Sequence, residues 1–184
     1  MRNWLTIVLL LLWMPGTAFA DEALWDRLRA GGLVVAIRHA HAPGTGDPPQ
    51  FRLDNCSTQR NLSASGRAQA AALGAAFRDR GIPVGRVLSS RWCRALDTAR
   101  IAFGSAEPEP ALDSLFGRRD RTETQTATIA SLIRAWPRTG GNLILVSHNA
   151  NIAALTGLSP ADAEIIVLTA APDGSIQVLG RLHT

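Results

Sequence analysis

The sequence predicts an α/β fold with three layers, α/β/α, built on a mainly parallel sheet with an antiparallel hairpin at its C-terminal edge. Three short, largely apolar runs at residues 33–38, 86–89 and 142–147 are bounded by loop signals, which is typical of buried parallel strands. Helical segments alternate with these runs, as they do in layered α/β domains. Near the C-terminus, the turn residues 172–174 (PDG) join two further apolar runs and predict the hairpin.

The domain is expected to begin with a short helix and a buried strand. Asp21 is a candidate N-cap for a helix over residues 22–30, which a pair of glycines would end. The strand at residues 33–38 follows. Residues 40–61 then form a loop rich in Pro, Gly, Asp and Asn. A loop of that length within a compact domain usually serves a function.

The middle of the chain continues the alternation of helix and strand. Ser63 is predicted to cap a helix that runs to about Arg80 and ends before a Gly and a Pro. A strand at residues 86–89 leads into a helix at residues 92–103. A loop with Pro and Glu follows at residues 104–110.

The last part of the chain completes the sheet. Thr122 with Gln125 resembles a capping box for a helix that reaches Trp136. The remaining elements are a strand at residues 142–147, a short helix at 150–156 and the hairpin strands at 165–168 and 176–179. No repeat or internal linker is present, so residues 21–184 are predicted to form one domain.

The charge pattern favours an anionic substrate. The 184-residue chain has 19 basic and 15 acidic residues and a formal net charge of +4, and every basic residue is arginine. The arginine side chain grips phosphate and carboxylate groups with a planar fork. The arginines are scattered and no basic run is longer than Arg118-Arg119, so a nucleic-acid partner is not indicated.

The first twenty residues have the layout of a secretory signal peptide. Arg2 supplies a positive start, residues 4–14 form an apolar run, and residues 18–20 (AFA) match an A-x-A cleavage site. The apolar run is too short to span a bilayer core about 30 Å thick. We therefore expect a mature chain from Asp21, without stable membrane anchoring, in the periplasm or outside the cell. An uncleaved anchor is the alternative.

Residues with catalytic potential follow three predicted strands. The first strand ends in Arg38 and His39, the second runs into a segment that contains Arg94, and the third ends next to His148. In open α/β sheets, ligands bind beyond the carboxyl ends of the strands. We expect these four side chains to meet in one pocket.

Two histidines and two arginines together suit phosphoryl transfer. The arginines would bind a phosphate dianion. A neutral imidazole can attack phosphorus and form a phosphohistidine, and cationic neighbours lower its pKa and keep it unprotonated. The second histidine would donate to the phosphoryl oxygens as negative charge develops there.

Two other interpretations stay open. A histidine at the end of a strand is often only a hydrogen-bonded polar residue. His39, His41 and His148 would also supply three metal ligands. Arg38 and Arg94 would repel a cation, however, and no carboxylate adjoins either pair in the sequence. We expect neither a metal nor a cofactor.

Four segments resemble motifs of the histidine phosphatase superfamily, also called phosphoglycerate-mutase-like. The matching segments are residues 38–40 (RHA, for R-H-G), 62–70 (LSASGRAQA, for L-[ST]-x-x-G-x-x-Q-A), 89–99 (SSRWCRALDTA, for S-S-x-x-x-R-A-x-x-T-A) and 144–149 (ILVSHN, for the strand with the second histidine). The matches occur in family order and span most of the mature chain. The ordered set is much more specific than any one motif.

The resemblance implies a role for each matched residue. His39 would be the phosphorylated nucleophile, Arg38 and Arg94 would hold the phosphoryl group, and His148 would be the second histidine of the substrate pocket. Small exported members with R-H-A look like hydrolases, and some act on lipopolysaccharide sugars or on protein phosphohistidine.

The proton donor departs from the family pattern. Asn149 stands where the acid phosphatase branch has an Asp donor, which disfavours that branch. The mutase-like branch uses a Glu, and none occurs in residues 111–117. Asp113 is the nearest carboxylate and is the predicted general acid. Its alternatives are Asp120, Glu123 and Glu164.

Cys56 and Cys93 are predicted to form a disulfide, because an exported chain with two cysteines often joins them. The bridge would fix the long loop to the pocket wall beside Arg94. Two free buried thiols are the alternative.

The prediction is a metal-independent exported phosphatase that hydrolyses a phosphate monoester of a small substrate through phosphohistidine. A phosphohistidine-protein phosphatase and a protein that binds a phosphorylated ligand without turnover are the alternatives.

Overall fold

The computed structural model describes residues 16–184. Most of the predicted signal peptide therefore lies outside the described residues. The first described element is helix α1 (Gly16–Ala30), so the predicted cleavage site at residues 18–20 falls within this helix. No helix of the described part of the chain is both long and apolar enough to cross a membrane.

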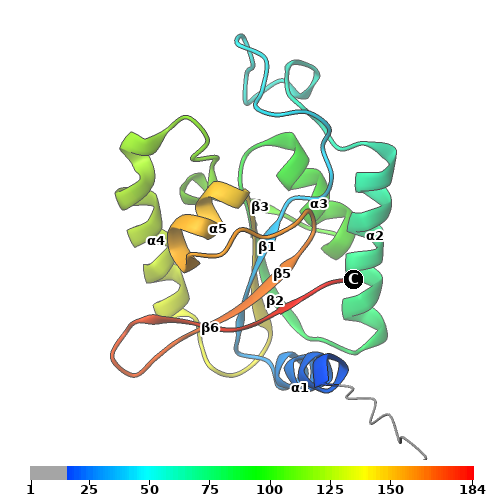
Figure 1. The fold of residues 1–184 in the computed structure, drawn as a ribbon, viewed down its shortest axis with the longest axis vertical. Helices are drawn as coiled ribbons and strands as arrows, with labels where there is room; N and C mark the ends of the chain where they lie inside the picture. The colour runs from blue at the N-terminus through cyan, green and yellow to red at the C-terminus, as the bar shows by residue number, and fades with distance from the viewer. Residues whose placement is uncertain (1–15) are drawn as a thin grey trace, which may run out of the picture.

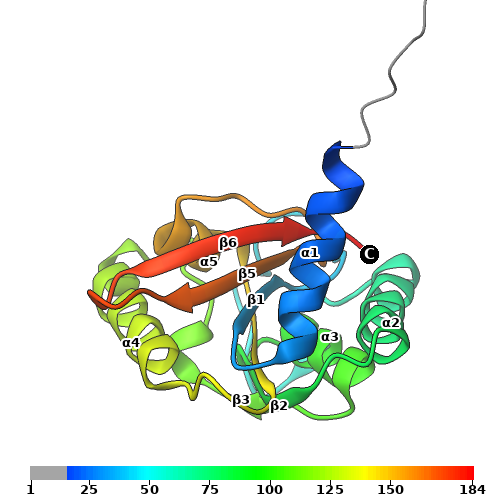
Figure 2. The same cartoon turned by 90° about the horizontal axis from the view of Figure 1, so that it is seen from below.

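A six-stranded sheet forms the centre of the molecule, in the order β3-β2-β4-β1-β5-β6. The strands are β1 (Val34–Arg38), β2 (Val84–Ser89), β3 (Glu107–Pro108), β4 (Asn142–Ser147), β5 (Ile165–Ala170) and β6 (Ile176–Leu182). The first four run parallel, and β5 is antiparallel to both β1 and β6. This confirms the predicted α/β fold and its C-terminal hairpin, seen at the edge of the sheet in Figure 2.

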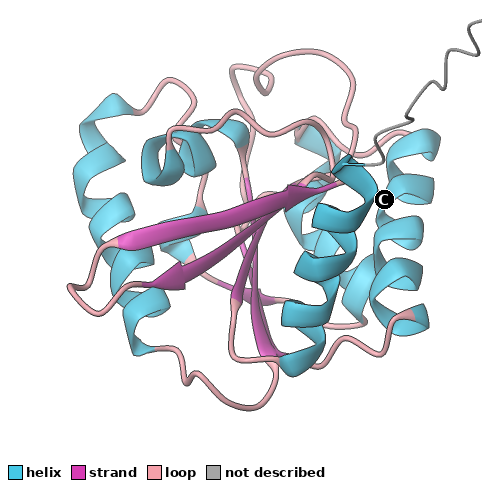
Figure 3. Ribbon diagram, turned by 60° about the horizontal axis from the view of Figure 1, so that its bottom comes forward, coloured by secondary structure: helices cyan, strands magenta, loops and turns pink. Residues whose placement is uncertain are grey.

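Helices cover both faces of this sheet, which makes three layers (Figures 1 and 3). The remaining helices are α2 (Ala64–Asp79), α3 (Cys93–Phe103), α4 (Thr122–Ala135), α5 (Asn149–Thr156) and the 3₁₀ turns η1 (Cys56–Thr58), η2 (Pro110–Leu112) and η3 (Arg119–Arg121). Ser63 caps α2 as predicted, because its Oγ accepts from the Gly66 amide at 3.0 Å. The Gly174 turn closes the hairpin with φ of 82°, a conformation that suits glycine.

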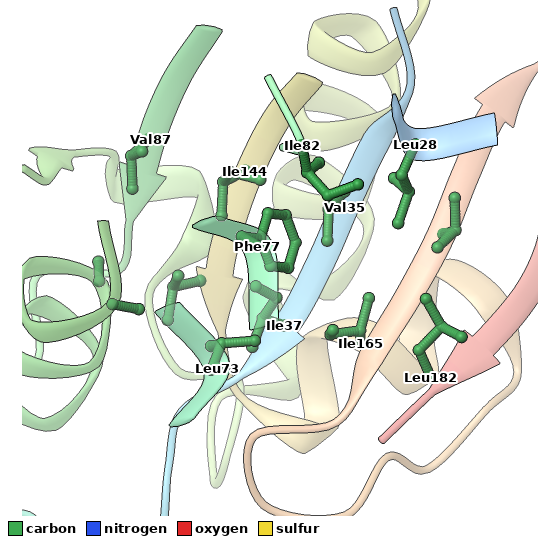
Figure 4. Close-up of a cluster of buried hydrophobic side chains, with 14 of the residues drawn as sticks. Leu28, Val35, Ile37, Leu73, Phe77, Ile82, Val87, Ile144, Ile165 and Leu182 are labelled. Atoms are coloured by element: carbon green, nitrogen blue, oxygen red, sulfur yellow. The ribbon is translucent and has the colours of Figure 1, made fainter. Parts of the chain in front are cut away.

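Two apolar clusters hold the layers together. On one face, side chains of α1, α2 and α3 pack on the sheet around Phe77, which lies over Val35, Ile37 and Ile144 (Figure 4). On the other face, Ile129 of α4 and further side chains from α5 pack against the alternate residues of the same strands. Burial on both faces explains why β1 and β4 read as continuous apolar runs in the sequence.

Three sequence expectations differ from the structure. Helix α1 begins at Gly16, so Asp21 lies inside it and is not its cap. Strand β3 pairs with β2 where a loop was expected. The capping box is also wrong, because Gln125 donates instead to carbonyls of the segment that precedes α4, including that of Asp113.

Strand register brings the chemically interesting residues together. Arg38 of β1 pairs with Ser147 of β4, and Ser89 of β2 pairs with Val146 of the same strand. The His39 amide continues the ladder by donating to the Ser147 carbonyl at 2.9 Å. The three parallel strands thus end at one edge of the sheet, below the loop that rises at the top of Figure 1.

Candidate active site

A pocket of about 530 Å³ lies at the carboxyl ends of β1, β2 and β4. Arg38, His39, Arg94 and His148 all line it, so the structure brings together the four residues that the sequence singled out. The walls come from the loop after β1, from the start of α3 and from residues 114–118.

His39 is held as a neutral imidazole with one nitrogen facing an arginine. Its Nδ1 lies 2.8 Å from the Ala40 carbonyl oxygen, which can only accept, so this nitrogen carries the proton. Nε2 accepts from Arg94 Nε at 3.3 Å. Burial lowers the pKa of His39 to about 4 against the effect of the Ala40 hydrogen bond, and Arg94, Arg60 and Arg38 lower it further. His39 is therefore unprotonated at Nε2 near neutral pH.

His148 is the second histidine of the pocket. Its ring centroid lies 5.2 Å from that of His39, and the two rings are 67° apart. Its Nε2 is 2.8 Å from the Ser90 hydroxyl, which in turn accepts from the Trp92 amide. Burial, followed by the charges of His39 and the nearby arginines, holds the pKa of His148 well below its usual value. Ser90 and Trp92 fix the ring from one side.

Arg38 lines the pocket, and its guanidinium is only partly engaged by acceptors of the protein. Its Nη1 donates to the Pro160 carbonyl at 3.0 Å, and its Nη2 lies 2.9 Å from Asp162. Its Nε is buried and has no acceptor within residues 16–184. A phosphoryl oxygen in the pocket would satisfy that donor.

Arg94 is the buried cation at the base of the pocket, and Asp47 is its counter-ion. The Arg94 side chain is only 3% exposed, and its Nη1 lies 2.8 Å from Asp47 Oδ1. Asp47 also accepts from the Arg60 amide at 3.0 Å and from Trp92 Nε1 at 2.9 Å. Burial alone would raise the pKa of the Asp47 carboxyl, but these donors, Arg94 first, hold it below its ordinary value.

Asp47 and Arg60 are pocket residues that the sequence analysis did not identify. Both come from the loop after β1, whose unusual length was the only signal of function. Arg60 donates through Nε to the Gly46 carbonyl at 2.9 Å and also donates to Ala42. Its charge contributes to the low pKa of His39. Arg60 therefore joins Arg38 and Arg94 as a third arginine whose charge acts on His39.

A disulfide joins Cys56 to Cys93, as predicted, and their Cα atoms are 5.7 Å apart. The bond connects η1 in the long loop to the first residue of α3. Gln59 reinforces this connection, because its Oε1 accepts from the Cys93 amide at 3.0 Å. The loop is thus fixed to the helix that carries Arg94.

Asp113 does not have the surroundings that a proton donor needs. Its carboxylate accepts from the Arg91 amide at 3.0 Å and from Arg91 Nε at 2.8 Å, and it does not line the pocket. Its carbonyl accepts from Gln125 and Asn151. Asp113 was predicted because it is the carboxylate nearest to the donor position of the resembled family, and that position gives no sign of the ion pair with Arg91. Asp113 instead fixes the start of α3 against the 110–113 turn.

The alternative donors lie elsewhere as well. Glu164 is buried and accepts from the Ala161 amide at 2.6 Å, and Asp120 lies 4.0 Å from Arg121 at an exposed turn. Asp120, Glu123 and Glu164 do not line the pocket. Asp47 is the one carboxylate that does so within residues 16–184.

The alternative three-histidine metal site is not assembled. His41 Nδ1 lies 2.9 Å from Asp162 Oδ2, and this histidine does not line the pocket. Among the residues that the structure describes, no group of three or more His, Cys, Asp or Glu side chains is arranged to hold a metal ion.

Solved structures with this fold include several phosphatases. The protein histidine phosphatase SixA, solved with tungstate, is 18% identical with a TM-score of 0.57, covering 82% of this chain and 96% of that one. The putative phosphohistidine phosphatase SixA from Agrobacterium tumefaciens is 21% identical with a TM-score of 0.54, at 83% and 97% coverage. A mycobacterial glucosyl-3-phosphoglycerate phosphatase is 19% identical with a TM-score of 0.60, at 82% and 97% coverage.

The sequence itself establishes the family. A comparison with curated proteins finds no match. The family model of the histidine phosphatase superfamily (branch 1) matches residues 34–139, which is more than half of the chain and includes His39 and Arg94. The chain therefore belongs to the histidine phosphatase superfamily, branch 1.

Proposed function

We propose that the protein is an exported phosphatase that hydrolyses phosphate monoesters through a phosphohistidine at His39. The observation that carries the proposal is the state of that side chain. Its Nδ1 proton is held by the Ala40 carbonyl, and its unprotonated Nε2 faces Arg94 inside a cationic pocket. Membership of the superfamily supports phosphatase activity.

In the first step, His39 Nε2 attacks phosphorus, and the bond between phosphorus and the leaving-group oxygen breaks. The oxygen leaves with the bonding electron pair and takes up a proton from water, because the one carboxylate that lines the pocket within the described residues is ionised. Arg38, Arg60 and Arg94 meet the charge on the phosphoryl oxygens, and His148 lies beside His39 to stabilise the same group.

In the second step, water attacks the phosphohistidine. The P–N bond breaks, inorganic phosphate is released, and His39 returns to its neutral form. Its low pKa favours this return, because a neutral imidazole is ready for the next attack near neutral pH. The arginines provide the positive charge that a metal would otherwise supply, so we propose that neither step requires a metal ion.

A second candidate activity is the hydrolysis of phosphohistidine on proteins. Asp47 is the one pocket carboxylate within the described residues, and it is ionised and engaged by Arg94. A pocket without a free carboxylic acid favours leaving groups that depart easily, and imidazole needs less protonation than an alkoxide. Two of the solved structures above are described as phosphohistidine phosphatases, SixA, one of them putative.

The test uses the chain from Asp21 with p-nitrophenyl phosphate, an alkyl phosphate and a phosphohistidine protein. We expect turnover that survives EDTA, and acid-labile, base-stable label on His39 in a rapid quench. Label on a serine would overturn the mechanism. Loss of turnover on chelation, with rescue by a divalent ion, would overturn the metal-free chemistry. Saturable binding of phosphate without turnover would identify a binding protein instead.

Export rests on the layout of residues 1–20 and on the disulfide, which is stable in an oxidising compartment. The N-terminal sequence of the protein in a periplasmic or secreted fraction tests this proposal. We expect it to begin at Asp21, and recovery of the full chain in the membrane fraction would indicate an uncleaved anchor.

A further inference from the structure

The mouth of the pocket has an exposed aromatic side chain that the proposed chemistry does not use. Phe116 is 64% exposed, although it is a large apolar residue, and it lines the pocket. A Cβ atom added at Gly46 would lie 3.5 Å from Phe116 Cε1, so the ring lies close to the loop after β1. Single exposed apolar residues are common on protein surfaces, but this one lines the same pocket as His39 and His148.

Two further aromatic rings lie in series beside the second histidine of the pocket. The Trp92 ring centroid lies 5.6 Å from that of His148, and the Phe51 centroid lies 5.5 Å from that of Trp92, with the two planes tilted by 36°. Both Trp92 and Phe51 line the pocket. A leaving group attached to a phosphoryl group between His39 and His148 would therefore have aromatic surface beside it.

An arginine that is not needed for the phosphoryl group lines the same mouth. Arg118 is exposed and lines the pocket two residues after Phe116. Arg121 in the next turn lies 4.0 Å from Asp120, whereas Arg118 forms no ion pair within the part of the chain that the structure describes. The Arg118 charge is thus available to a second anionic group on the ligand.

We propose that Phe51, Trp92, Phe116 and Arg118 form a leaving-group subsite. Its ligand is a small phosphorylated compound whose leaving group has a ring with an apolar face and a second anionic substituent. A pocket of about 530 Å³ is within the range that binds ligands of drug size, so it has room for such a group beside the phosphate. The subsite rests on the proposed function, because it assumes that the phosphoryl group binds at His39.

Phosphonates test the subsite without requiring turnover. Benzylphosphonate, butylphosphonate and 4-carboxybenzylphosphonate share the dianionic head and differ in the ring and in the second anion. By calorimetry at low ionic strength, we expect wild type to bind the benzyl compound about fivefold more tightly than the butyl one, as an aromatic contact provides. A further gain of about threefold is expected for the carboxybenzyl compound, as an exposed ion pair provides.

The variants separate the two parts of the subsite. Phe116→Ala should remove the preference for benzyl over butyl, and Arg118→Ala should remove the gain from the carboxylate. Arg119→Ala is the matched control, because Arg119 is exposed in the same turn and does not line the pocket. It should keep both preferences. Phe116 and Arg118 are exposed, so their replacement leaves the core intact.

The outcomes distinguish the subsite from the proposed function. Equal affinity of wild type for the benzyl and butyl compounds would overturn the ring contact. Preferences that persist in Phe116→Ala and Arg118→Ala would overturn the assignment of those residues. Failure to bind any phosphonate, together with no turnover of p-nitrophenyl phosphate, would overturn the proposed function and the subsite with it.

Discussion

Replacement of Asp47 by Asn is expected to impair the enzyme through Arg94. Both carboxylate oxygens are used: Oδ1 accepts from Arg94 and from the Arg60 amide, and Oδ2 accepts from Trp92 Nε1. Asn has one acceptor oxygen, so it cannot satisfy both sides. Whichever way the amide turns, its NH₂ group faces an N–H donor. The buried Arg94 also loses its counter-ion.

The contacts set the size of the effect. A hydrogen bond to a charged group contributes about 1.5–3 kcal/mol, and a neutral one about 1 kcal/mol. The Asp47 side chain is 9% exposed beside an open pocket, so the lower values apply. We expect a loss of stability of about 2.5 kcal/mol, which lowers the melting temperature by about 5–10 °C in a domain of this size. If the stabilisation of the transition state by Arg94 falls by the same free energy, kcat/KM falls by about 70-fold.

The assay compares two leaving groups. The kcat/KM of Asp47→Asn is measured with p-nitrophenyl phosphate and with phenyl phosphate, whose leaving group is more basic. A residue that orients Arg94 affects both substrates equally. Asp54→Asn is the matched control, because Asp54 lies in the same loop and forms an exposed ion pair with Arg52. Exposed pairs contribute little, so the control should behave as wild type.

Two results would refute this reasoning. Wild-type kcat/KM in Asp47→Asn would show that Arg94 does not need its counter-ion. A loss that grows with the basicity of the leaving group would show that Asp47 donates the proton, in spite of its low pKa.

Four further outcomes follow from the structure. His39→Ala should abolish turnover and leave no acid-labile phosphate label, and residual label would place the nucleophile elsewhere. Asp113→Asn should lower activity equally for alkyl and p-nitrophenyl phosphates because Asp113 anchors Arg91 outside the pocket; a loss confined to alkyl phosphates would restore its role as the acid. Denatured, unreduced protein should have no free thiol, and two titratable thiols would contradict the Cys56–Cys93 bond. The unfolded chain protonates His39 near pH 6.5 and the folded one near pH 4, so His39 should contribute a loss of about 3 kcal/mol of stability as pH falls through that window. Unfolding experiments should show a smaller loss in His39→Gln, in which His148 still has a lowered pKa, and an unchanged loss would contradict the low pKa of His39.

The four central pocket residues were predictable because each lies at or just after the carboxyl end of a parallel strand. Buried apolar runs identify β1 and β4, and parallel strands end at one edge of the sheet. Arg38, His39 and His148 therefore lie close together regardless of the loop conformations. Arg94 follows β2 in the first turn of α3. Strand periodicity and strand ends are local signals in the sequence, and the positions of these residues depend mainly on those signals.

Asp47 and Arg60 were not predictable in the same way. They lie in a loop without periodicity, and their positions depend on contacts across the fold, such as the bond from Asp47 to Arg94. Asp113 illustrates the same limit, because its partner Arg91 is 22 positions away in the chain. Gln125 was read as a local cap but serves the 110–113 turn instead. Side chains that bridge separate elements leave no pattern within either element.

The hydrogen bond from the His39 amide to the Ser147 carbonyl has a consequence for how the protein could evolve. It makes His39, the proposed nucleophile, an extension of the sheet ladder, whereas the mouth of the pocket belongs to the loop after β1 and to residues 114–118. Mutations at the mouth of the pocket can alter which compound is admitted without moving His39. Because the loop after β1 also carries Asp47 and Arg60, grafting residues 114–118 alone between relatives should transfer preference for a leaving group while the residues proposed to bind the phosphoryl group keep their places.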